Sequence, residues 1–283
     1  MILDGKALAK KIENTIRQRA NEFSEKYGMK ASLHTILIGN DEASKIYAKS
    51  KINALKNVGM TGEIHYLEEN SHESEIIDIL NKLSSRNDVH GIMVEMPLPK
   101  HLKKENILSS IDPRKDVDGQ NPINLGKLML GIEDHSPSTP KAVIRILEEY
   151  GVNLASKNVC IINRTPVVGK PLSMLFLNRD ATVTICHSKT KNLHEITRNS
   201  EIVVVAVGKP NFLTGDMINE NSIVVDVGIN SIDGKIVGDA DFNALVDKVS
   251  MITPVPGGVG SVTTILIVEQ TLNNAFEIMG KIY

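Results

Sequence analysis

The sequence predicts an α/β fold built from two αβ units, and two observations carry this prediction. Short runs of β-branched residues alternate with amphipathic stretches along almost all of the 283 residues, a pattern typical of parallel sheets with helices on their faces. The predicted strands are also nearly continuous apolar runs, as in sheets that are covered on both sides. Because the alternation is interrupted once, around residues 111–138, a boundary between the two units is expected there.

The predicted elements follow one another regularly along the chain. Three strands are expected before the interruption and five after it, at 34–39, 63–67, 91–96, 158–162, 182–186, 202–207, 223–228 and 249–253. The amphipathic stretches between them predict helices at 41–58, 72–86, 139–151, 169–178, 191–198 and 241–247, and residues 261–280 indicate one long helix. Residues 111–138 are rich in Pro, Gly, Asp and Asn and are expected to be an irregular connection.

The composition excludes several classes of protein. With a net charge of -2 the chain has no basic excess to neutralise phosphates, which argues against a nucleic-acid-binding protein. The N-terminus has no apolar signal-peptide core, and the longest apolar runs are too short to cross a bilayer. Cys160 and Cys186 lie in separate apolar runs and are expected to be buried, reduced thiols. These features favour a cytoplasmic protein.

A candidate nucleotide site follows the first strand of the second unit. Residues 163–171 (NRTPVVGKP) form a short loop and a helix start, where free N–H groups and the helix dipole attract phosphate. Because Asn163 replaces the first glycine of the G-x-G-x-x-G pattern, an ordinary βα turn also remains possible here. The next strand ends in HSKT, without the carboxylate that binds the ribose of NAD. Arg164 and Ser188 instead suit a 2′-phosphate, so the residues favour NADP.

The first unit carries the candidate reactive groups. Tyr47 and Lys51 are four residues apart on the helix predicted at 41–58 and share a face, although this spacing is also common on ordinary helices. Short-chain dehydrogenases use the same spacing, but their nucleotide loop precedes the pair, so that class is excluded. Asp116 and Asp118 in KDVDG indicate a turn, and no further ligands follow at a spacing suited to metal. The sequence therefore predicts no metal site.

Ten motifs in order resemble the bifunctional methylenetetrahydrofolate dehydrogenase/methenyltetrahydrofolate cyclohydrolase family. They are YAKSK, VEMPLP, KDVDG, TPKAV, NRTPVVGKP, ATVTICHSKT, AVGKP, DVGIN, VGDA and TPVPGGVG. The resemblance implies two αβ domains flanking a cleft: a folate-binding domain of residues 1–136 with the C-terminal helix 262–283, and a Rossmann-type NADP-binding domain of residues 137–261. It further implies a homodimer that oxidises 5,10-methylenetetrahydrofolate with NADP and hydrolyses the methenyl product to 10-formyltetrahydrofolate.

The resemblance also assigns site residues. Lys51 would be the central catalytic residue, Tyr47 would orient the folate and Asp118 would hold its pterin. Glu95 is the fourth predicted catalytic residue, but it departs from the family pattern and is included for its charge alone. The predicted substrate-binding residues are Tyr47, Lys51, Val94, Met96, Asp118, Pro256, Gly257, Gly258, Val259 and Gly260. The predicted cofactor-binding residues are Asn163, Arg164, Thr165, Ser188, Gly208, Ile229 and Thr263, of which Arg164 and Ser188 would contact the 2′-phosphate and Ile229 would lie near the nicotinamide.

The chain departs from the family pattern at three positions. Asn163 replaces a glycine, Ser261 replaces a proline, and Glu95 replaces the glutamine that hydrogen-bonds the catalytic lysine. At about 4 Å and an effective dielectric of about 20, a carboxylate attracts an ammonium by roughly 4 kcal/mol, so Glu95 is expected to keep Lys51 protonated. Our hypothesis is that the dehydrogenase survives, whereas the cyclohydrolase is weakened or uses Glu95 as an alternative base; pairing of Glu95 with another cation is the competing interpretation.

Three other functions remain open at this point. The first is a folate enzyme with dehydrogenase activity alone. The second is an NADP-dependent dehydrogenase of another small substrate, such as an amino or hydroxy acid, although such a substrate would not need the extended lining formed by KDVDG and PGGVG. The third is an inactive folate- or nucleotide-binding module, against which the intact Tyr47, Lys51 and Asp118 argue.

Overall fold

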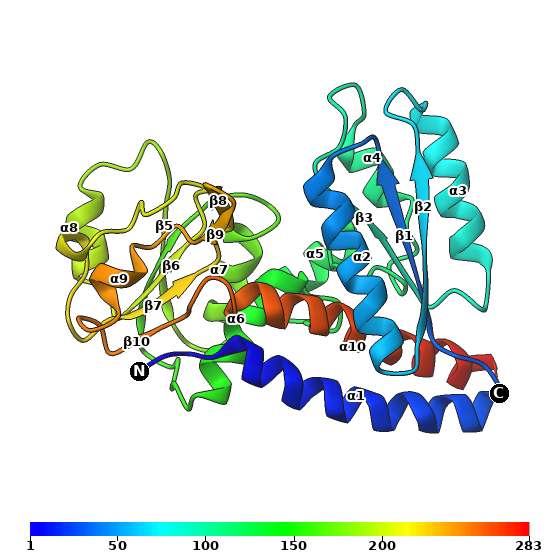
Figure 1. Cartoon of the computed structure of the whole chain (residues 1–283), viewed down its shortest axis with the longest axis horizontal. Helices are drawn as coiled ribbons and strands as arrows, with labels where there is room; N and C mark the ends of the chain where they lie inside the picture. The colour runs from blue at the N-terminus through cyan, green and yellow to red at the C-terminus, as the bar shows by residue number, and fades with distance from the viewer. Residues whose placement is uncertain (283) are drawn as a thin grey trace. The chain divides into compact units, whose positions relative to one another are not determined.

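The computed structural model describes residues 1–282, and the chain divides into two compact units. The three-stranded unit comprises Lys11–Lys127, Asp134–Ser138 and the chain from Thr264 onward. The five-stranded unit comprises Met1–Lys10, Leu128–Glu133 and Thr139–Thr263. Both units are α/β and their main sheets are parallel, which confirms the predicted fold class (Figure 1).

The sheet of the three-stranded unit has the order β2-β1-β3. Its strands are β1 (Ser32–Ile38), β2 (Thr61–Leu67) and β3 (Gly91–Val94), connected by helices α2 (Glu42–Asn57) and α3 (Glu73–Ser85). One face of the sheet packs against α3, where Ile36 and Ile92 join Ile76 and Leu80 in a fully buried cluster. Helices α1 (Gly5–Tyr27) and α10 (Val259–Ile282) meet through the rings of Phe23 and Phe276, whose centroids are 5.2 Å apart.

The sheet of the five-stranded unit has the order β10-β7-β6-β4-β5. Its strands are β4 (Asn158–Ile162), β5 (Thr182–Cys186), β6 (Ile202–Val205), β7 (Ile223–Asp226) and β10 (Met251–Ile252). Helix α6 (Ser138–Glu149) leads into β4, and α7 (Gly169–Leu177), α8 (Leu193–Arg198) and α9 (Phe242–Leu245) lie between later strands. Because the chain goes from β4 outward to β5 and then returns to β6 on the other side, the strand order reverses between β4 and β6. Ligands of open parallel sheets bind at the carboxyl ends of strands at such a switch point.

The first residues of the chain extend this sheet. Ile2 forms a parallel bridge with Ile252, and the Leu3 N–H donates to the Ile252 carbonyl over 2.8 Å. The Lys6 N–H donates to Gly257, and Gly5 lies so close to the Gly258 backbone that no side chain fits there. The N-terminal residues thus belong to the five-stranded unit, although the sequence placed residues 1–136 together.

All eight predicted strands are present, but five shorter elements were not predicted. Residues 111–138 were expected to be irregular, which was wrong for α5 (Pro122–Met129): its proline occupies the first turn, where a missing N–H costs little. The others are α4 (Lys104–Ser109), the 3₁₀ helix η1 (Gly215–Met217) and a hairpin of β8 (Asn230–Ile232) and β9 (Lys235–Val237).

The two cysteines are free and fully buried on adjacent strands, as predicted, with their sulfur atoms 3.6 Å apart. Burial raises the pKa of the Cys160 thiol well above its usual range, which makes it unreactive. Within residues 1–282, none of the helices is both long and apolar enough to cross a membrane.

Candidate active site

A buried ion pair joins helix α2 to the end of strand β3. The Lys51 ammonium donates to both carboxylate oxygens of Glu95, over 2.7 and 3.0 Å. Their side chains are only 9% and 7% exposed. Glu95 is the first residue after β3, and its N–H still donates to Ile36 on β1. The sheet ends at this point because Pro97 cannot donate to a ladder, and the last paired residue therefore presents its carboxylate to Lys51.

Local hydrogen bonds hold helix α2 against the same loop. Asp41 caps the helix by accepting from the Ser44 N–H over 2.8 Å, as residues at this position commonly do. The Ser44 hydroxyl contacts both Asp41 and the Met96 carbonyl. This link fixes the N-terminal turns of α2 beside the residues that follow β3.

Tyr47 and Asp118 lie close to this ion pair. The Lys51 Nζ is 6.0 Å from the centre of the Tyr47 ring, and Tyr47 keeps 40% of its surface exposed, so the ring is available for stacking. Asp118 is half-buried and accepts from the Gln120 amide and the Ser138 hydroxyl. The structure therefore brings together the four predicted catalytic residues, with Val94 and Met96 on either side of Glu95.

The protonation of Glu95 is set by opposing effects. Burial, the largest effect, raises the pKa of its carboxyl, the Lys51 ammonium lowers it, and the Asp118 carboxylate raises it; the net direction is upward. A carboxylate with a raised pKa in contact with a cation can exchange a proton with bound groups. Sequence patterns did not indicate Lys104, at the start of α4. Burial lowers the pKa of its ammonium, and the Asp118 carboxylate, which lies near enough to act on it, partly opposes this effect.

The loop after β4 is organised by Asn163. Its amide donates to the Ala206 carbonyl over 2.5 Å, which links the loops that follow β4 and β6 at the switch point. Its side-chain oxygen accepts from the N–H groups of Thr165 and Gly169 and from the Thr165 hydroxyl, over 2.8 to 2.9 Å. The N–H groups at the start of α7 were expected to be free for phosphate, but two of them are not. The Gly169 N–H donates to the Asn163 side chain, and the Val168 N–H donates to the Thr165 hydroxyl.

The residues expected to bind a 2′-phosphate are exposed at this edge. Arg164 and Ser188 are both exposed and follow the neighbouring strands β4 and β5, and within residues 1–282 the Arg164 guanidinium makes no ion pair. No carboxylate follows β5, where the chain continues His187-Ser188-Lys189-Thr190. The donor set suits an anion rather than a ribose hydroxyl, so the chain's own residues fit NADP.

Two buried aspartates, which the sequence did not single out, support the remaining nucleotide loops. Asp239 accepts from the N–H groups of Gly208 and Lys209 over 2.9 Å and from Val207, and it also binds the Asn230 amide. Asp226 accepts from the N–H groups of 228, 239 and 240, although burial raises its pKa to about 6. Any side chain at Gly228 or Gly238 would collide with these carboxylates. The motifs DVGIN and VGDA thus form one interlocked support.

The remaining predicted residues lie on the five-stranded unit. Ile229 is 47% exposed and lies beside Gly260, which brings a residue predicted near the nicotinamide next to the turn predicted to line the folate. Gly257 has a φ of 104°, a conformation that other residues rarely adopt. The Thr263 hydroxyl donates to the Val259 carbonyl within helix α10. Pro256 is exposed, whereas Gly258 is buried against Pro254 and Gly5.

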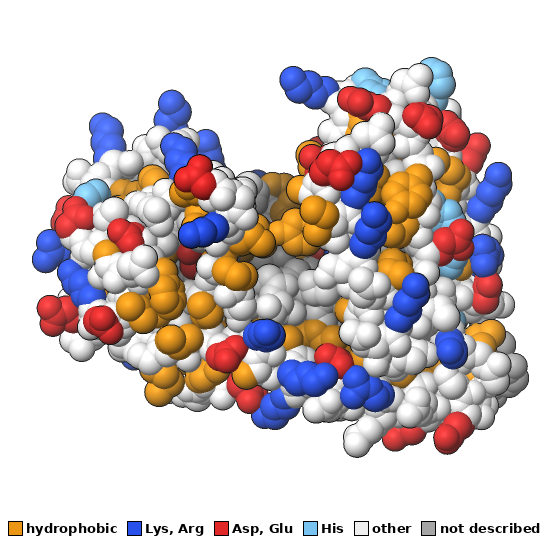
Figure 2. All heavy atoms as spheres, viewed as in Figure 1, with side chains coloured by type: hydrophobic (Ala, Val, Ile, Leu, Met, Phe, Trp, Pro, Cys, Tyr) orange, Lys and Arg blue, Asp and Glu red, His pale blue; other side chains and the backbone are white. Residues whose placement is uncertain are grey.

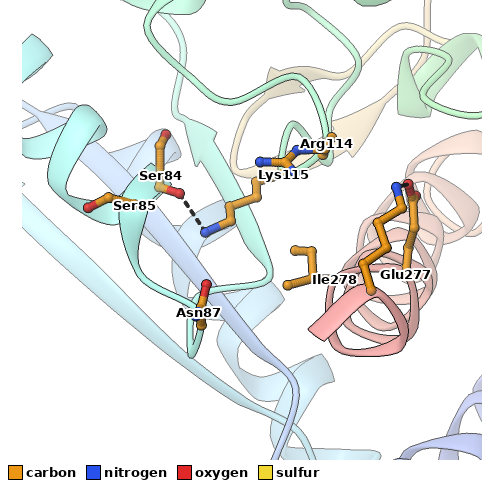
Figure 3. Close-up of a pocket in the computed structure, with 8 residues that line it drawn as sticks. Ser84, Ser85, Asn87, Arg114, Lys115, Glu277 and Ile278 are labelled. Carbon is orange, nitrogen blue, oxygen red and sulfur yellow. Dashed lines mark hydrogen bonds and ion pairs between the residues drawn. The ribbon is translucent and has the colours of Figure 1, made fainter. Parts of the chain in front are cut away.

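A pocket of about 220 Å³ elsewhere in the three-stranded unit is lined by three cationic side chains, each of which is bonded within the chain (Figure 3). Lys115 points from its wall to the end of α3 and donates to the carbonyls of Ser84 and Arg86 over 2.7 and 2.5 Å. Arg114 is paired with Asp112 and Lys281 with Glu277. All three cations are used within the chain, so the pocket offers none of them to a ligand.

The fold and these residues define a two-unit α/β protein with a nucleotide-binding unit and a separate buried Lys–Glu centre. Residues 3–118 match the model of the tetrahydrofolate dehydrogenase/cyclohydrolase catalytic domain, and residues 137–278 match that of the NAD(P)-binding domain of the same enzymes. The chain belongs to the tetrahydrofolate dehydrogenase/cyclohydrolase family, as its motifs predicted.

Relatives of known name span the whole chain. It is 45% identical to the bifunctional protein FolD of Campylobacter concisus over 96% of both chains. The crystal structure of the bifunctional FolD of Campylobacter jejuni superposes with a TM-score of 0.95 at 43% identity, covering 98% of this chain and 99% of that one. A Trypanosoma brucei FolD, solved with NADP and an inhibitor, superposes with a TM-score of 0.94 at 32% identity, covering 98% and 97%.

Proposed function

We propose that this chain oxidises 5,10-methylenetetrahydrofolate to the methenyl form with NADP and hydrolyses that product to 10-formyltetrahydrofolate, the hydrolysis being the weaker activity. Full-length membership of the family, together with the Lys51–Glu95 pair, supports this proposal. The folate would be bound and converted by Lys51, Tyr47, Asp118 and Glu95. The 2′-phosphate of NADP would be bound by Arg164 and Ser188. NADP, when bound, accepts the hydride.

The ion pair suits the oxidation. Loss of a hydride from the methylene carbon leaves a cation on the substrate, which an uncompensated ammonium nearby would destabilise. Glu95 neutralises Lys51 through both carboxylate oxygens. The pair therefore presents no net positive charge to the cation that develops during hydride transfer.

The same pair hinders the hydrolysis. Water must add to the methenyl carbon and lose a proton before the ring C–N bond opens to leave the formyl group. A base is needed for this proton, but both carboxylate oxygens of Glu95 already accept from the Lys51 side chain. Each oxygen keeps a second lone pair, but the two contacts, at 2.7 and 3.0 Å, lower the affinity of Glu95 for that proton.

Assays of both reactions on wild type and Glu95→Gln test this proposal. We expect wild type to be an NADP-dependent dehydrogenase that prefers NADP to NAD, and the ratio of hydrolysis to oxidation to rise at least about tenfold in Glu95→Gln, since general base catalysis contributes about 10²–10⁴-fold. Glu42→Gln is the matched control, because Glu42 forms an exposed pair with Lys45 on the same helix. A vigorous wild-type hydrolysis that Glu95→Gln leaves unchanged would contradict the role given to Glu95.

We also propose a homodimer formed through the five-stranded unit, as the resemblance implies. Strand β5 is the edge of its sheet, and Ile185 on it is 37% exposed. The β8–β9 hairpin presents Ile232 and Ile236. Sedimentation of wild type and Ile185→Lys would show a dimer that the substitution weakens; a wild type that sediments as a monomer at assay concentration would contradict it.

Cytoplasmic residence and the absence of a nucleic-acid partner complete the proposal. The adjacent thiols of Cys160 and Cys186 stay free most readily in a reducing compartment, and the net charge of -2 provides little attraction for phosphate backbones. Cell fractionation and a salt-dependent DNA-binding assay test these two statements.

A further inference from the structure

Two histidines and a glutamate meet on the edge of the three-stranded sheet, away from Lys51. The His34 Nδ1 lies 2.8 Å from the His65 Nε2 and 3.8 Å from a carboxylate oxygen of Glu63. One potential ligand atom from each residue lies within 4.8 Å of the other two. Figure 2 shows histidine and acidic side chains side by side on the surface over the β2 edge.

The strand register builds this cluster. His34 on β1 is paired with Glu63 on β2, and His65 follows two residues later on the same face of β2. Strand β2 is an edge strand, so Glu63 is 62% exposed, whereas the His34 side chain is only 5% exposed. The cluster thus has a buried member (His34), a partly buried member (His65) and an exposed member (Glu63).

The spacing of the three groups fits a transition metal after small side-chain rotations. Tetrahedral zinc with ligands at about 2.0–2.2 Å needs its ligand atoms about 3.3 Å apart, a value that lies between the observed 2.8 and 3.8 Å. One N–H now lies between the two imidazoles. A metal ion would replace this proton, which moves to the other nitrogen of the same ring, so that both nitrogens present lone pairs to the ion.

The charges around the cluster favour a cation. Arg86 and Asp88 are the other charged groups that act on His34, and they neutralise each other through two hydrogen bonds of 3.0 and 2.7 Å. Burial and the neighbouring His65 lower the pKa of His34 to about 4. His34 is therefore neutral at physiological pH and ready to act as a ligand, and Glu63 supplies a compensating negative charge.

We propose that His34, His65 and Glu63 bind one divalent transition-metal ion of the zinc type, with a fourth position open to water. Two imidazoles and one carboxylate form a ligand set that zinc accepts. The ion would clip the edge strand β2 to β1. Lys51 and Glu95 lie towards the carboxyl ends of these parallel strands, whereas His34 lies near the amino end of β1, so the ion has a structural rather than a catalytic role.

Titration of tag-free, chelator-treated full-length protein with zinc chloride tests this proposal. We expect one ion per chain with a dissociation constant in the micromolar range or tighter, visible absorption bands with cobalt chloride, and a rise in Tm on zinc addition. His65→Gln and Glu63→Gln should each weaken binding by at least about tenfold, because loss of a supporting group alone costs about 10–100-fold. Dehydrogenase activity of these variants should equal that of wild type.

The control is His194→Gln. His194 also lies near a carboxylate, 3.4 Å from Asp216, but in the other unit and outside the cluster. Since His65 and Glu63 are partly exposed, their variants should fold even if His34→Asn does not. Absence of stoichiometric zinc binding, binding unchanged in both variants, or a loss of binding in His194→Gln would each overturn the proposal.

Discussion

Replacing Glu95 with leucine should destabilise the three-stranded unit through Lys51. The substitution leaves the buried ammonium without the carboxylate that contacts it at 2.7 and 3.0 Å. With Lys51 only 9% exposed on its side chain, water can compensate little of this loss. Breaking a buried pair on one side costs about 3–5 kcal/mol, and we expect Glu95→Leu to fall in this range.

Removing both charges should restore most of the stability. A buried ion pair repays the desolvation of its partners only approximately, so an apolar replacement of both is often neutral. We expect Lys51→Met/Glu95→Leu to lie within about 1 kcal/mol of wild type. The coupling energy between the two sites should then exceed about 2 kcal/mol, which is large for residues in contact.

Hydrogen exchange measured by mass spectrometry suits this test, because it separates the two units. Peptides from α2 and β3 report the opening free energy around the pair, and peptides from β4 and β6 serve as an internal control. Equal protection of α2 in Glu95→Leu and wild type would refute the reasoning. So would a double variant whose destabilisation is the sum of the single ones.

Three further outcomes are expected. Burial raises the native pKa of Asp226 to about 6 against 3.8. The stability that its protonated form contributes is therefore full well below pH 3.8 and is lost as the pH rises through 6. Wild type should lose about 2 kcal/mol relative to Asp226→Asn between pH 4 and 7 in urea titrations; a relative gain would show that the three N–H donors outweigh burial. Asn163→Gly should raise the KM for NADP about tenfold, because it removes the side chain that joins the loops after β4 and β6. The KM for folate should stay unchanged. Asn153→Gly is the control, because the Asn153 side chain caps only a local turn. Lys115→Met should cost about 1–3 kcal/mol and increase exchange at the end of α3, whereas the exposed Lys82→Met should not.

The sequence revealed those parts of the fold whose signal is local. Continuous apolar runs such as 202–205 identify strands because both faces of the sheet are covered. The β8–β9 hairpin was missed because its strands have three residues each and are largely exposed. Its turn was nevertheless readable: Asp233-Gly234 has positive φ at both positions, the signature of a tight hairpin.

Residues of the candidate site could be predicted where the signal lies within one helix or strand, but not where it depends on contacts between several elements. Tyr47 and Lys51 share a helix, and Glu95 ends a strand, so each could be singled out. The supporting role of Asp239 depends on N–H groups about 30 residues away, and the cluster of His34 with Glu63 and His65 depends on the register of two strands. Spacing along one segment contains neither piece of information.

Pairing of Ile2 with Ile252 constrains the order in which this chain can fold during its synthesis. The edge of the five-stranded sheet stays open until residue 252 has been synthesised, and the three-stranded unit likewise waits for Phe276 to reach Phe23. A chain halted by a premature stop codon before residue 250 would therefore expose the apolar surfaces of both units. Such a truncated product is a substrate for chaperones and proteases, not a partly working enzyme.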